Sequence, residues 1–431
     1  MLLIITAFML LLFYSFLVLK KDFKSPIFIF TSVWFLILTL YTLKLFGIYS
    51  VEFKTEVVLS LGILSFILGY YLYLPSYFNN NLTTTKSYII HYGNIRLLAI
   101  IILLLGLSFY KQQFMSLLEG RTLDENKILL VLGKVDSGGA IMQYIVRPFE
   151  HIFIAISAFC IFHKPGEKFL IFSGLLFTIL RFLSNGSKII IVYFVMCLVF
   201  SYLFAISKNI VWNSENFDSF SYVNFNKFVK VNRKYLIFFV IAISIFLIIY
   251  MKKNVSFLES LYFYLTGSVV MLDKTVNTTY YLNSGYTYTA TSLYTLWHIF
   301  YEFLSFFGLD GKNNSVFQNA LSFIERTSYT TYVSDYKTYN AFVTMFAQFY
   351  ADFGYFGVIG MSGSFGFFAN RVYNRLFNYV TLDYFIIYCI ILYYVYYGMV
   401  RFQMSSLPWG LSLLYSLFLI RFVFTMRIKI K

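Results

Sequence analysis

Segment 2–19 decides the fold, because it reads LLIITAFMLLLFYSFLVL and contains no charged residue. A helix needs about 20 mostly apolar residues to cross the hydrocarbon core of a membrane. Only helices and closed barrels satisfy their backbone hydrogen bonds there, and an unbroken apolar run favours a helix. Lys20, Lys21 and Lys24 follow the run, which lacks a small-residue cleavage site, so it predicts an uncleaved first membrane span.

Similar apolar runs recur along the chain. They cover residues 26–48, 56–77, 94–110, 145–162, 168–183, 188–207, 235–251, 353–370, 382–400 and 406–424. Hydrophobic residues make up 59% of the chain and charged residues 12%, against about 25% charged residues in a typical soluble domain. The sequence therefore predicts an all-α, polytopic integral membrane protein with about eleven transmembrane helices.

Basic residues concentrate in the connections that follow the odd-numbered predicted spans. Short cytoplasmic loops collect Lys and Arg, so these connections and the C-terminus are predicted to be cytoplasmic. Two long loops, 111–144 and 252–352, then lie outside. The predicted organisation is residues 1–251 with eight spans, 252–352 as a large extracytoplasmic loop between the eighth and ninth spans, and 353–431 with three spans and a basic cytoplasmic tail.

Several classes of function are disfavoured by composition and by missing motifs. The net charge of +15 is explained by cytoplasmic loops, and no nucleic-acid-binding module is present, so no nucleic-acid partner is predicted. The three cysteines, Cys160, Cys197 and Cys389, lie in apolar runs without disulfide or zinc spacing. No Walker loop, DxD, HExxH or GxSxG motif occurs, so we expect neither a metal nor a cofactor.

Cationic side chains at the outer ends of predicted spans are candidates for binding an anion. Arg147 begins the fifth span, Arg181 and Lys188 flank the turn between the sixth and seventh, Arg401 ends the tenth, and Arg326 lies in the large loop. Charges at membrane depth are costly and are often functional. An anionic headgroup in the outer leaflet would account for them, since Arg pairs with phosphate oxygens. Snorkelling to ordinary phospholipid is the alternative.

The large loop is rich in aromatic residues and contains an amphipathic helical pattern over 292–307. Its aromatic rings suit either an interfacial belt or a groove that stacks on sugars. His298 and Glu302 share the polar face of the pattern at a spacing of four. A carboxylate beside an imidazole orients it and raises its pKa, so the pair is a candidate general base. The alternative is a solvated face on an interfacial helix.

Three segments resemble the Wzy-type family of oligosaccharide repeat-unit polymerases, also called O-antigen polymerases. RFLSNGSK at 181–188 is similar to the step that opens a hydrophobic helix in that family, and TYNAFVTMFAQFYADFGYFG at 338–357 is similar to its Asp-Phe-Gly-x-x-Gly step after the large outer loop. Residues 264–273 are similar to the start of the same loop. The matching pieces cover about a tenth of the chain, and the arrangement of spans and loop covers all of it.

The resemblance implies a metal-independent glycosyltransferase in the bacterial inner (cytoplasmic) membrane that joins polyprenyl-diphosphate-linked oligosaccharides at its outer face. Its implied partners are these substrates, membrane lipids, and a chain-length regulator and a flippase of the same pathway. The expected roles are diphosphate binding by Arg147, Arg181, Lys188, Arg326 and Arg401, proton acceptance by His298, Glu302 or Asp352, and sugar binding by Tyr288, Tyr294, Trp297 and Tyr301. Asp352, near Gly354 and Gly357, is equally open to a structural role.

Three rival functions remain at this level. A flippase or other transporter would bind the same headgroup without bond chemistry, although no paired halves with broken spans are recognisable. An O-antigen ligase would use almost the same chemistry with a different acceptor. A membrane scaffold or receptor is disfavoured, because the cytoplasmic segment 208–234 is short for a signalling domain.

Overall fold

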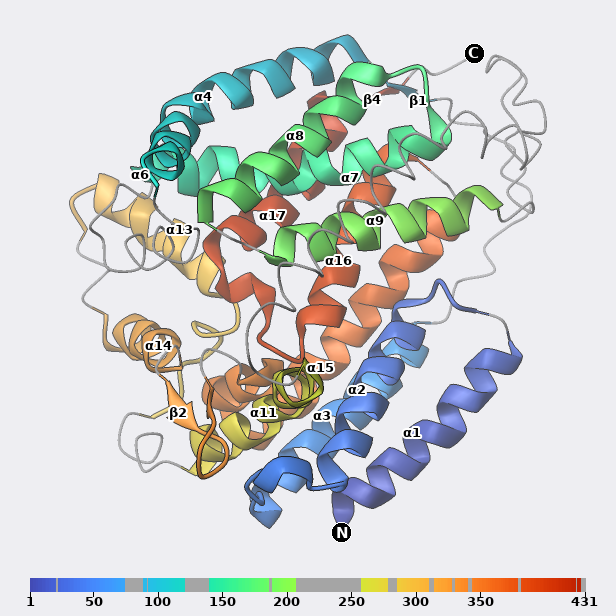
Figure 1. Cartoon of the computed structure of the whole chain (residues 1–431), viewed down its shortest axis with the longest axis vertical. Coiled ribbons are helices and arrows are strands. Elements are labelled where there is room, and N and C mark those ends of the chain that lie inside the picture. Colours follow the sequence, from blue (N-terminus) through green and yellow to red (C-terminus); the bar gives the residue numbers. More distant parts are fainter. Residues whose placement is uncertain are drawn as a thin grey trace.

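The structure is a computed structural model of the chain, and in the part of the chain that it describes it is an assembly of helices with four short strands at the periphery (Figure 1). It describes residues 1–20, 22–73, 88–90, 92–120, 139–185, 188–206, 257–277, 285–309, 314–327, 330–339, 343–378, 381–423 and 425–427. The predicted span 235–251 and most of the predicted loop 111–144 lie outside these residues.

Each other predicted span coincides with a helix or part of one. These helices are α1 (Leu2–Leu19), α2 (Pro26–Thr42), α3 (Phe53–Leu72), α4 (Tyr92–Leu118), α7 (Arg147–His163), α8 (Lys168–Asn185), α9 (Lys188–Ile206), α15 (Thr344–Asn378), α16 (Leu382–Tyr397) and α17 (Leu407–Val423). The predicted outer loop contains α11 (Phe257–Asn277), α13 (Tyr294–Phe306) and α14 (Ser315–Arg326).

Shorter elements complete the described chain. They are α6 (Gly139–Ile141), the π-helical η2 (Met142–Val146), the 3₁₀ turns η1 (Leu45–Gly47) and η3 (Gln403–Ser405), and two antiparallel strand pairs, β1 (Tyr88–Ile90) with β4 (Thr425–Arg427) and β2 (Thr331–Tyr332) with β3 (Thr338–Tyr339).

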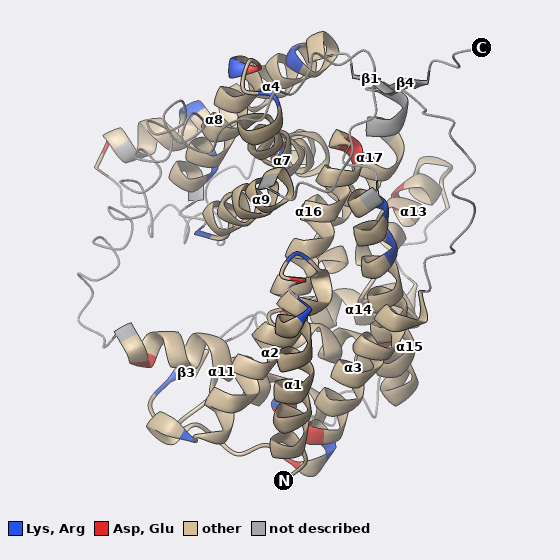
Figure 2. Cartoon of the chain, turned by 90° about the vertical axis from the view of Figure 1, so that its right-hand side faces the viewer, with Lys and Arg blue, Asp and Glu red and all other residues tan. Residues whose placement is uncertain are grey.

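The chain is an all-α membrane protein. Five helical segments of the described chain are long and apolar enough to cross a membrane: Leu2–Leu19, Phe53–Leu72, Tyr92–Ser116, Gly139–His163 and Lys188–Ala205. Shorter apolar helices run over Pro26–Thr42, Leu382–Tyr397 and Leu407–Phe418. Long stretches of these helices carry no charged residue (Figure 2), as a lipid-exposed surface requires.

Helix α16 is the centre of the molecule. It contacts α2 and α15 on one side and α7, α9 and α17 on the other, so it joins two groups of helices (Figure 1). Every residue from Phe385 to Val395 is buried. A helix that is apolar around its whole circumference is typically enclosed by other helices, which explains why this span shows no amphipathic face.

Helices α3 and α15 pack closely because glycines line their contact. A β-carbon added at Gly69 would lie 2.0 Å from the carbonyl oxygen of Gly363, and one added at Gly366 would lie 2.2 Å from that of Phe66. Small residues let helix backbones approach each other in membrane proteins. The contact therefore fixes the distance between the two helices.

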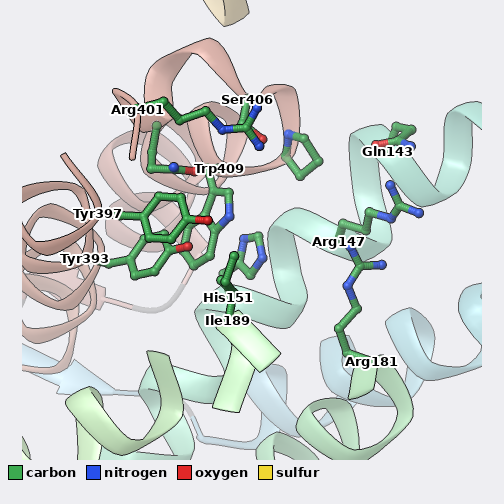
Figure 3. Close-up of a pocket in the computed structure, with 12 residues that line it drawn as sticks. Gln143, Arg147, His151, Arg181, Ile189, Tyr393, Tyr397, Arg401, Ser406 and Trp409 are labelled. Atoms are coloured by element: carbon green, nitrogen blue, oxygen red, sulfur yellow. The ribbon is translucent and has the colours of Figure 1, made fainter. Parts of the chain in front are cut away.

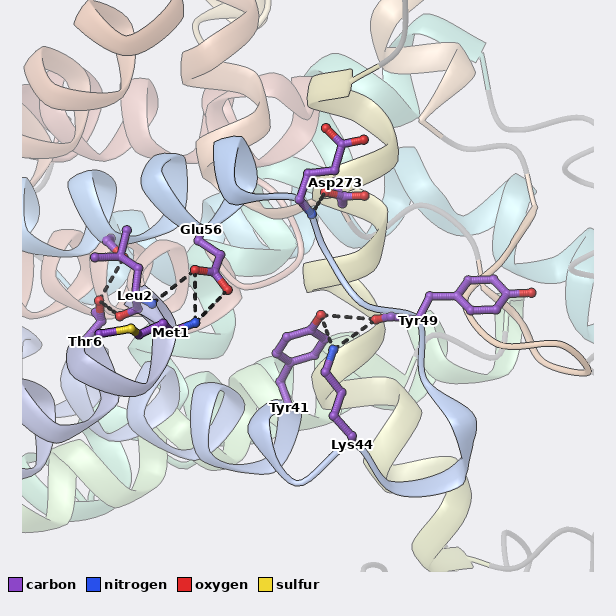
Figure 4. A network of polar contacts seen from close by, with 10 residues as sticks. Met1, Leu2, Thr6, Tyr41, Lys44, Tyr49, Glu56 and Asp273 are labelled. Carbon is purple, nitrogen blue, oxygen red and sulfur yellow. Dashed lines mark hydrogen bonds and ion pairs between the residues drawn. The ribbon is translucent and has the colours of Figure 1, made fainter.

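Helix α11, in the predicted outer loop, is attached to the helix bundle by polar contacts (Figure 4). The Asp273 carboxylate on α11 accepts hydrogen bonds from the Glu52 backbone N–H at 2.8 Å and the Thr55 hydroxyl at 2.7 Å. Lys54 Nζ donates to the Val276 carbonyl at 2.9 Å. A buried apolar face of α11 also packs on α2, α3 and α15. Residues 257–277 of the predicted loop 252–352 thus form a helix of the bundle.

The α3–α15 contact generates a prediction. We expect Gly366→Val to lower the free energy of unfolding by about 3 kcal/mol, because the new side chain meets backbone atoms that cannot move aside. Thermal unfolding of the purified protein in detergent measures the effect. Gly360→Val is the matched control on the same helix, since a β-carbon there meets nothing within 4 Å. Equal melting temperatures for the two variants would contradict the close packing.

Candidate functional site

A cavity of about 270 Å³ opens where several helix ends converge. It lies among the first turns of α7, α9 and α17, the end of α8 and the segment that follows α16 (Figure 3). Pro408 stands in the first turn of α17, where proline costs no hydrogen bond and its fixed φ suits the helix. Pro148 instead follows η2 within a continuous helix, and the Tyr144 carbonyl accepts a hydrogen bond from the Tyr415 hydroxyl at 2.8 Å. The lining residues are Gln143, Arg147, His151, Arg181, Ile189, Tyr393, Tyr397, Arg401, Gln403, Ser406, Pro408 and Trp409.

Three of the five predicted cations meet in this cavity. Arg147 and Arg181 lie side by side on one wall, whereas Arg401 lies on the opposite side (Figure 3). The lining includes no carboxylate. Long helices separate these residues in the sequence, so the fold has brought three positive charges to one concave site.

One buried carboxylate lies behind the arginine pair. Glu150 is fully buried, and its Oε2 lies 3.7 Å from Arg181 Nε. Its other oxygen accepts a hydrogen bond from the Tyr110 hydroxyl. Among the described residues, Arg181 Nη1 and Arg401 Nε are buried without a hydrogen-bond partner. Buried cationic atoms are costly unless paired, so an anion in the cavity that pairs with Arg181 Nη1 and Arg401 Nε would be stabilising.

The opposite wall of the cavity is a stack of aromatic rings. The His151 and Trp409 rings are 3.6 Å apart and nearly parallel, Trp409 stacks on Tyr393 at 4.0 Å, and Tyr393 stacks on Tyr397 at 5.2 Å. His151 Nδ1 shares a hydrogen bond of 2.8 Å with the Ser412 hydroxyl. These contacts hold the wall in place without any charge.

The other two predicted cations do not line the cavity. Lys188 is exposed at the first position of α9, and only its neighbour Ile189 reaches the lining. Arg326 is exposed at the end of α14. The sequence predicted five cations for one anion-binding site, and the fold brings three of them together in the cavity.

The predicted His298–Glu302 pair forms beside the cavity. His298 Nε2 lies 3.6 Å from Glu302 Oε1 and 2.6 Å from the Tyr144 hydroxyl. Tyr144 directly follows Gln143, which lines the cavity. The Tyr294 hydroxyl lies 3.4 Å from His298 Nδ1, and burial raises the pKa of that tyrosine. The imidazole itself does not line the cavity, but it is joined to the lining through the neighbouring residues Tyr144 and Gln143.

Three of the four predicted sugar-binding rings belong to one aromatic cluster on α13. Tyr294 stacks on Phe317 at 5.5 Å, Tyr301 meets Phe317 edge to face at 4.8 Å, and Trp297 lies 5.6 Å from Tyr301. Tyr288 is elsewhere: it is exposed and meets Phe353 at the break in α15. The fold therefore divides the predicted sugar groove between two places.

Helix α13 is attached to the same region as the cavity. The Thr295 hydroxyl donates to the Met404 carbonyl at 2.8 Å, within η3. Gly410, in the first turns of α17, allows this approach, because a β-carbon there would lie 2.2 Å from Thr295 Oγ1. The aromatic cluster and the His298–Glu302 pair are therefore held next to the segment that follows α16.

Asp352 is buried next to a break in helix α15 and holds two segments of the chain together. Helix α15 breaks at Phe353 and Gly354, where Gly354 has a φ of +61°. The carboxylate accepts hydrogen bonds from the Thr287 hydroxyl at 2.6 Å, the Thr291 backbone N–H at 3.1 Å and the backbone and hydroxyl of Ser292. Both carboxylate oxygens accept hydrogen bonds and are buried. The carboxylate therefore connects the turn before α13 to the break in α15.

Comparisons and metal-site geometry add no further assignment. No protein-family model, curated protein or solved structure matches the chain. Within the residues that the structure describes, no group of three or more His, Cys, Asp or Glu side chains is placed to hold a metal ion. The expectation that the protein needs neither metal nor cofactor stays a prediction. The interpretation of the cavity therefore rests on its own geometry.

The position of Asp352 generates a prediction. Asp352→Asn should lower the free energy of unfolding by about 3 kcal/mol, because an amide nitrogen replaces an acceptor that faces backbone and hydroxyl donors. Thermal unfolding in detergent measures this loss. Asp335→Asn, on an exposed turn, is the control and should leave the melting temperature unchanged. A stable but inactive Asp352→Asn variant would instead assign the carboxylate to the chemistry.

Proposed function

We propose that the protein polymerises polyprenyl-diphosphate-linked oligosaccharide repeat units into a surface polysaccharide. The observation that carries this proposal is the meeting of Arg147, Arg181 and Arg401 in one cavity without a lining carboxylate. Guanidinium groups pair with phosphate oxygens in a bidentate geometry. A diphosphate at the head of a lipid would satisfy this set of charges.

The proposed topology places the cavity at the outer face of the bacterial cytoplasmic membrane. With about eleven spans and a cytoplasmic C-terminus, the start of the fifth span and the ends of the sixth and tenth all face outward. These are the positions of Arg147, Arg181 and Arg401. One orientation thus puts all three arginines on the side where the lipid-linked units are joined, with segment 252–352 beside them.

The proposed reaction is a glycosyl transfer. A hydroxyl oxygen of the acceptor unit attacks the anomeric carbon of the donor sugar, and the bond from that carbon to the diphosphate oxygen breaks. The bonding electrons leave with the polyprenyl diphosphate, whose growing charge the three arginines stabilise. Because these cations are already in place, little reorganisation is needed as the charge develops.

The acceptor proton passes to His298 in this proposal. Glu302 orients the imidazole and stabilises the imidazolium that forms, and the Tyr144 hydroxyl holds the ring by a hydrogen bond. The rings of Tyr294, Trp297 and Tyr301 lie along the same helix, where they are placed to contact an acceptor sugar. Asp352 takes no part, since its oxygens are occupied.

A flippase is the rival that shares the anionic headgroup. Such a protein needs the arginines but no proton acceptor, so the His298–Glu302 pair beside the cavity favours transfer. An O-antigen ligase differs only in its acceptor. As partners of a polymerase we propose a chain-length regulator and a flippase of the same pathway, in addition to membrane lipids.

The arginine cavity generates a prediction for cells. Arg147→Ala, Arg181→Ala and Arg401→Ala should each reduce polymer formation about 100-fold, because each removes a fixed cation from the leaving diphosphate. Gel display of surface polysaccharide should then show single repeat units instead of a ladder.

The control is Arg371→Ala, which removes an exposed arginine of α15 outside the cavity and should leave the ladder unchanged. Normal ladders in all three cavity variants would reject the proposed site. Loss of even the single units from the outer face would favour the flippase.

The proton acceptor generates a separate prediction. His298→Ala should slow polymerisation by purified protein at least 100-fold, because a positioned general base contributes about 10²–10⁴-fold to such reactions. Release of polyprenyl diphosphate from a lipid-linked unit measures the rate. Ser305→Ala, an exposed change on the same helix, is the control. An undiminished rate for His298→Ala would remove this residue from the chemistry.

A further inference from the structure

Two polar side chains in the cavity wall have no role in anion binding. The Tyr393 hydroxyl and Gln403 Nε2 belong to residues that are each 1% exposed. Neither atom has a hydrogen-bond partner within the described part of the chain. Buried polar atoms are nearly always paired, and an unpaired one destabilises a folded protein. Two such atoms in the wall of one cavity therefore point to a ligand that pairs with them.

The stacking of the wall determines what it can offer to a ligand. Trp409 covers one face of the Tyr393 ring and Tyr397 stacks against it as well. Neither face of Tyr393 is left for a sugar ring to stack on. The hydroxyl groups of Tyr393 and Tyr397 instead point into the cavity (Figure 3). The rings of this wall can therefore recognise a ligand only by hydrogen bonds from their hydroxyl groups, and Arg401 lies on the same side of the cavity.

The arrangement of charge gives the ligand a direction. Arg147 and Arg181 lie across the cavity from the tyrosine hydroxyls, whereas Arg401 lies on the tyrosine side (Figure 3). A ligand that satisfies the whole lining carries an anionic part within reach of the arginines and uncharged oxygen atoms that face the tyrosine hydroxyls. A sugar attached to a diphosphate has this distribution.

We propose that Tyr393 and Gln403 form a subsite for the sugar bonded directly to the diphosphate of the donor. The inference rests on the proposed function. It adds that the site recognises this sugar as well as the diphosphate. The Gln403 amide donates to a hydroxyl or acetamido oxygen of that sugar, and the Tyr393 hydroxyl pairs with another. Because both atoms are covered in the empty cavity, binding requires a small movement of this wall.

A neutral subsite has a consequence for selectivity. A site built around hydrogen bonds to a hydroxyl or an amide discriminates against a ligand that lacks these groups, since its own buried atoms then stay unpaired. The protein should therefore bind a lipid-linked sugar more tightly than the same lipid diphosphate without sugar. It would also bind its released product, the bare lipid diphosphate, more weakly than its donor, which favours turnover.

The test compares two ligands on the full-length protein in nanodiscs. The probes are a polyprenyl diphosphate and the same lipid carrying one sugar, prepared with a hexose and with an N-acetylhexosamine. Tyr393→Phe and Gln403→Leu should each weaken binding of a sugar-carrying lipid about five- to tenfold, the usual effect of one lost hydrogen bond. Both variants should leave binding of the bare diphosphate unchanged. Tyr396→Phe, beside Tyr393 but outside the cavity lining, should change neither.

The outcomes separate the two proposals. An equal loss for both ligands would mean that Tyr393 and Gln403 contact the diphosphate, and no loss for either sugar would mean that they contact nothing. Either result overturns the subsite. Failure of the unmodified protein to bind the bare diphosphate, or unchanged binding in Arg181→Ala, would reject the proposed function instead.

Stability provides a second readout. Tyr393→Phe removes an unpaired buried hydroxyl, so the melting temperature of the empty protein should stay the same or rise. A residue retained only for packing would give a lower melting temperature together with weaker binding of both ligands. Unchanged or higher stability combined with a loss confined to sugar-carrying lipids identifies a recognition role.

Discussion

Three half-buried arginines that the fold brings together in one cavity are the constraint on which the rest of this structure depends. Glu150 lies behind Arg147 and Arg181, and its 3.7 Å approach to Arg181 pairs only part of that charge. Leaving cations in a region of low dielectric costs free energy, so the arrangement is stable only because packed helices enforce it. Cations that the fold holds in place in this way are how proteins prepare a site for an anion.

Helix α16 holds a large part of the cavity lining in position. Because it is buried on all sides, its position is set by the helices around it. Tyr393, Tyr397 and Arg401 follow one another at four-residue spacing, and the Arg401 backbone N–H still donates to the Tyr397 carbonyl at 3.0 Å. The end of α16 and the turn that follows it therefore carry a polar wall and one cation. The other two arginines come from α7 and α8, which pack against each other. A site assembled on helices in this way is held more firmly than one on loops.

The sequence was most informative where one physical effect dominates. Apolar runs predict helices, because membrane-spanning backbone has no other simple way to satisfy its hydrogen bonds. Charge at the ends of spans also identified the arginines of the cavity. It could not separate them from Lys188 and Arg326, because the direction of a side chain depends on how helices pack. Tyr393, Gln403 and Trp409 were missed altogether, since an aromatic or a lone amide near an apolar run looks like a lipid-facing or interfacial residue. The four-residue spacing of Tyr393, Tyr397 and Arg401 was the signal available.

The separation between the arginines and His298 follows from the geometry of the proposed transfer. In a direct displacement, the incoming hydroxyl and the departing diphosphate lie on opposite sides of the anomeric carbon. The proton acceptor and the cations must then stand apart, with a sugar ring between them. Gln143 and Tyr144 are neighbours in the π-helical segment η2, yet one lines the cavity and the other contacts His298. π-Helical turns often occur at functional sites, because the extra residue changes where side chains point. This turn joins the cationic cavity to the imidazole while keeping them apart, as the proposed reaction requires.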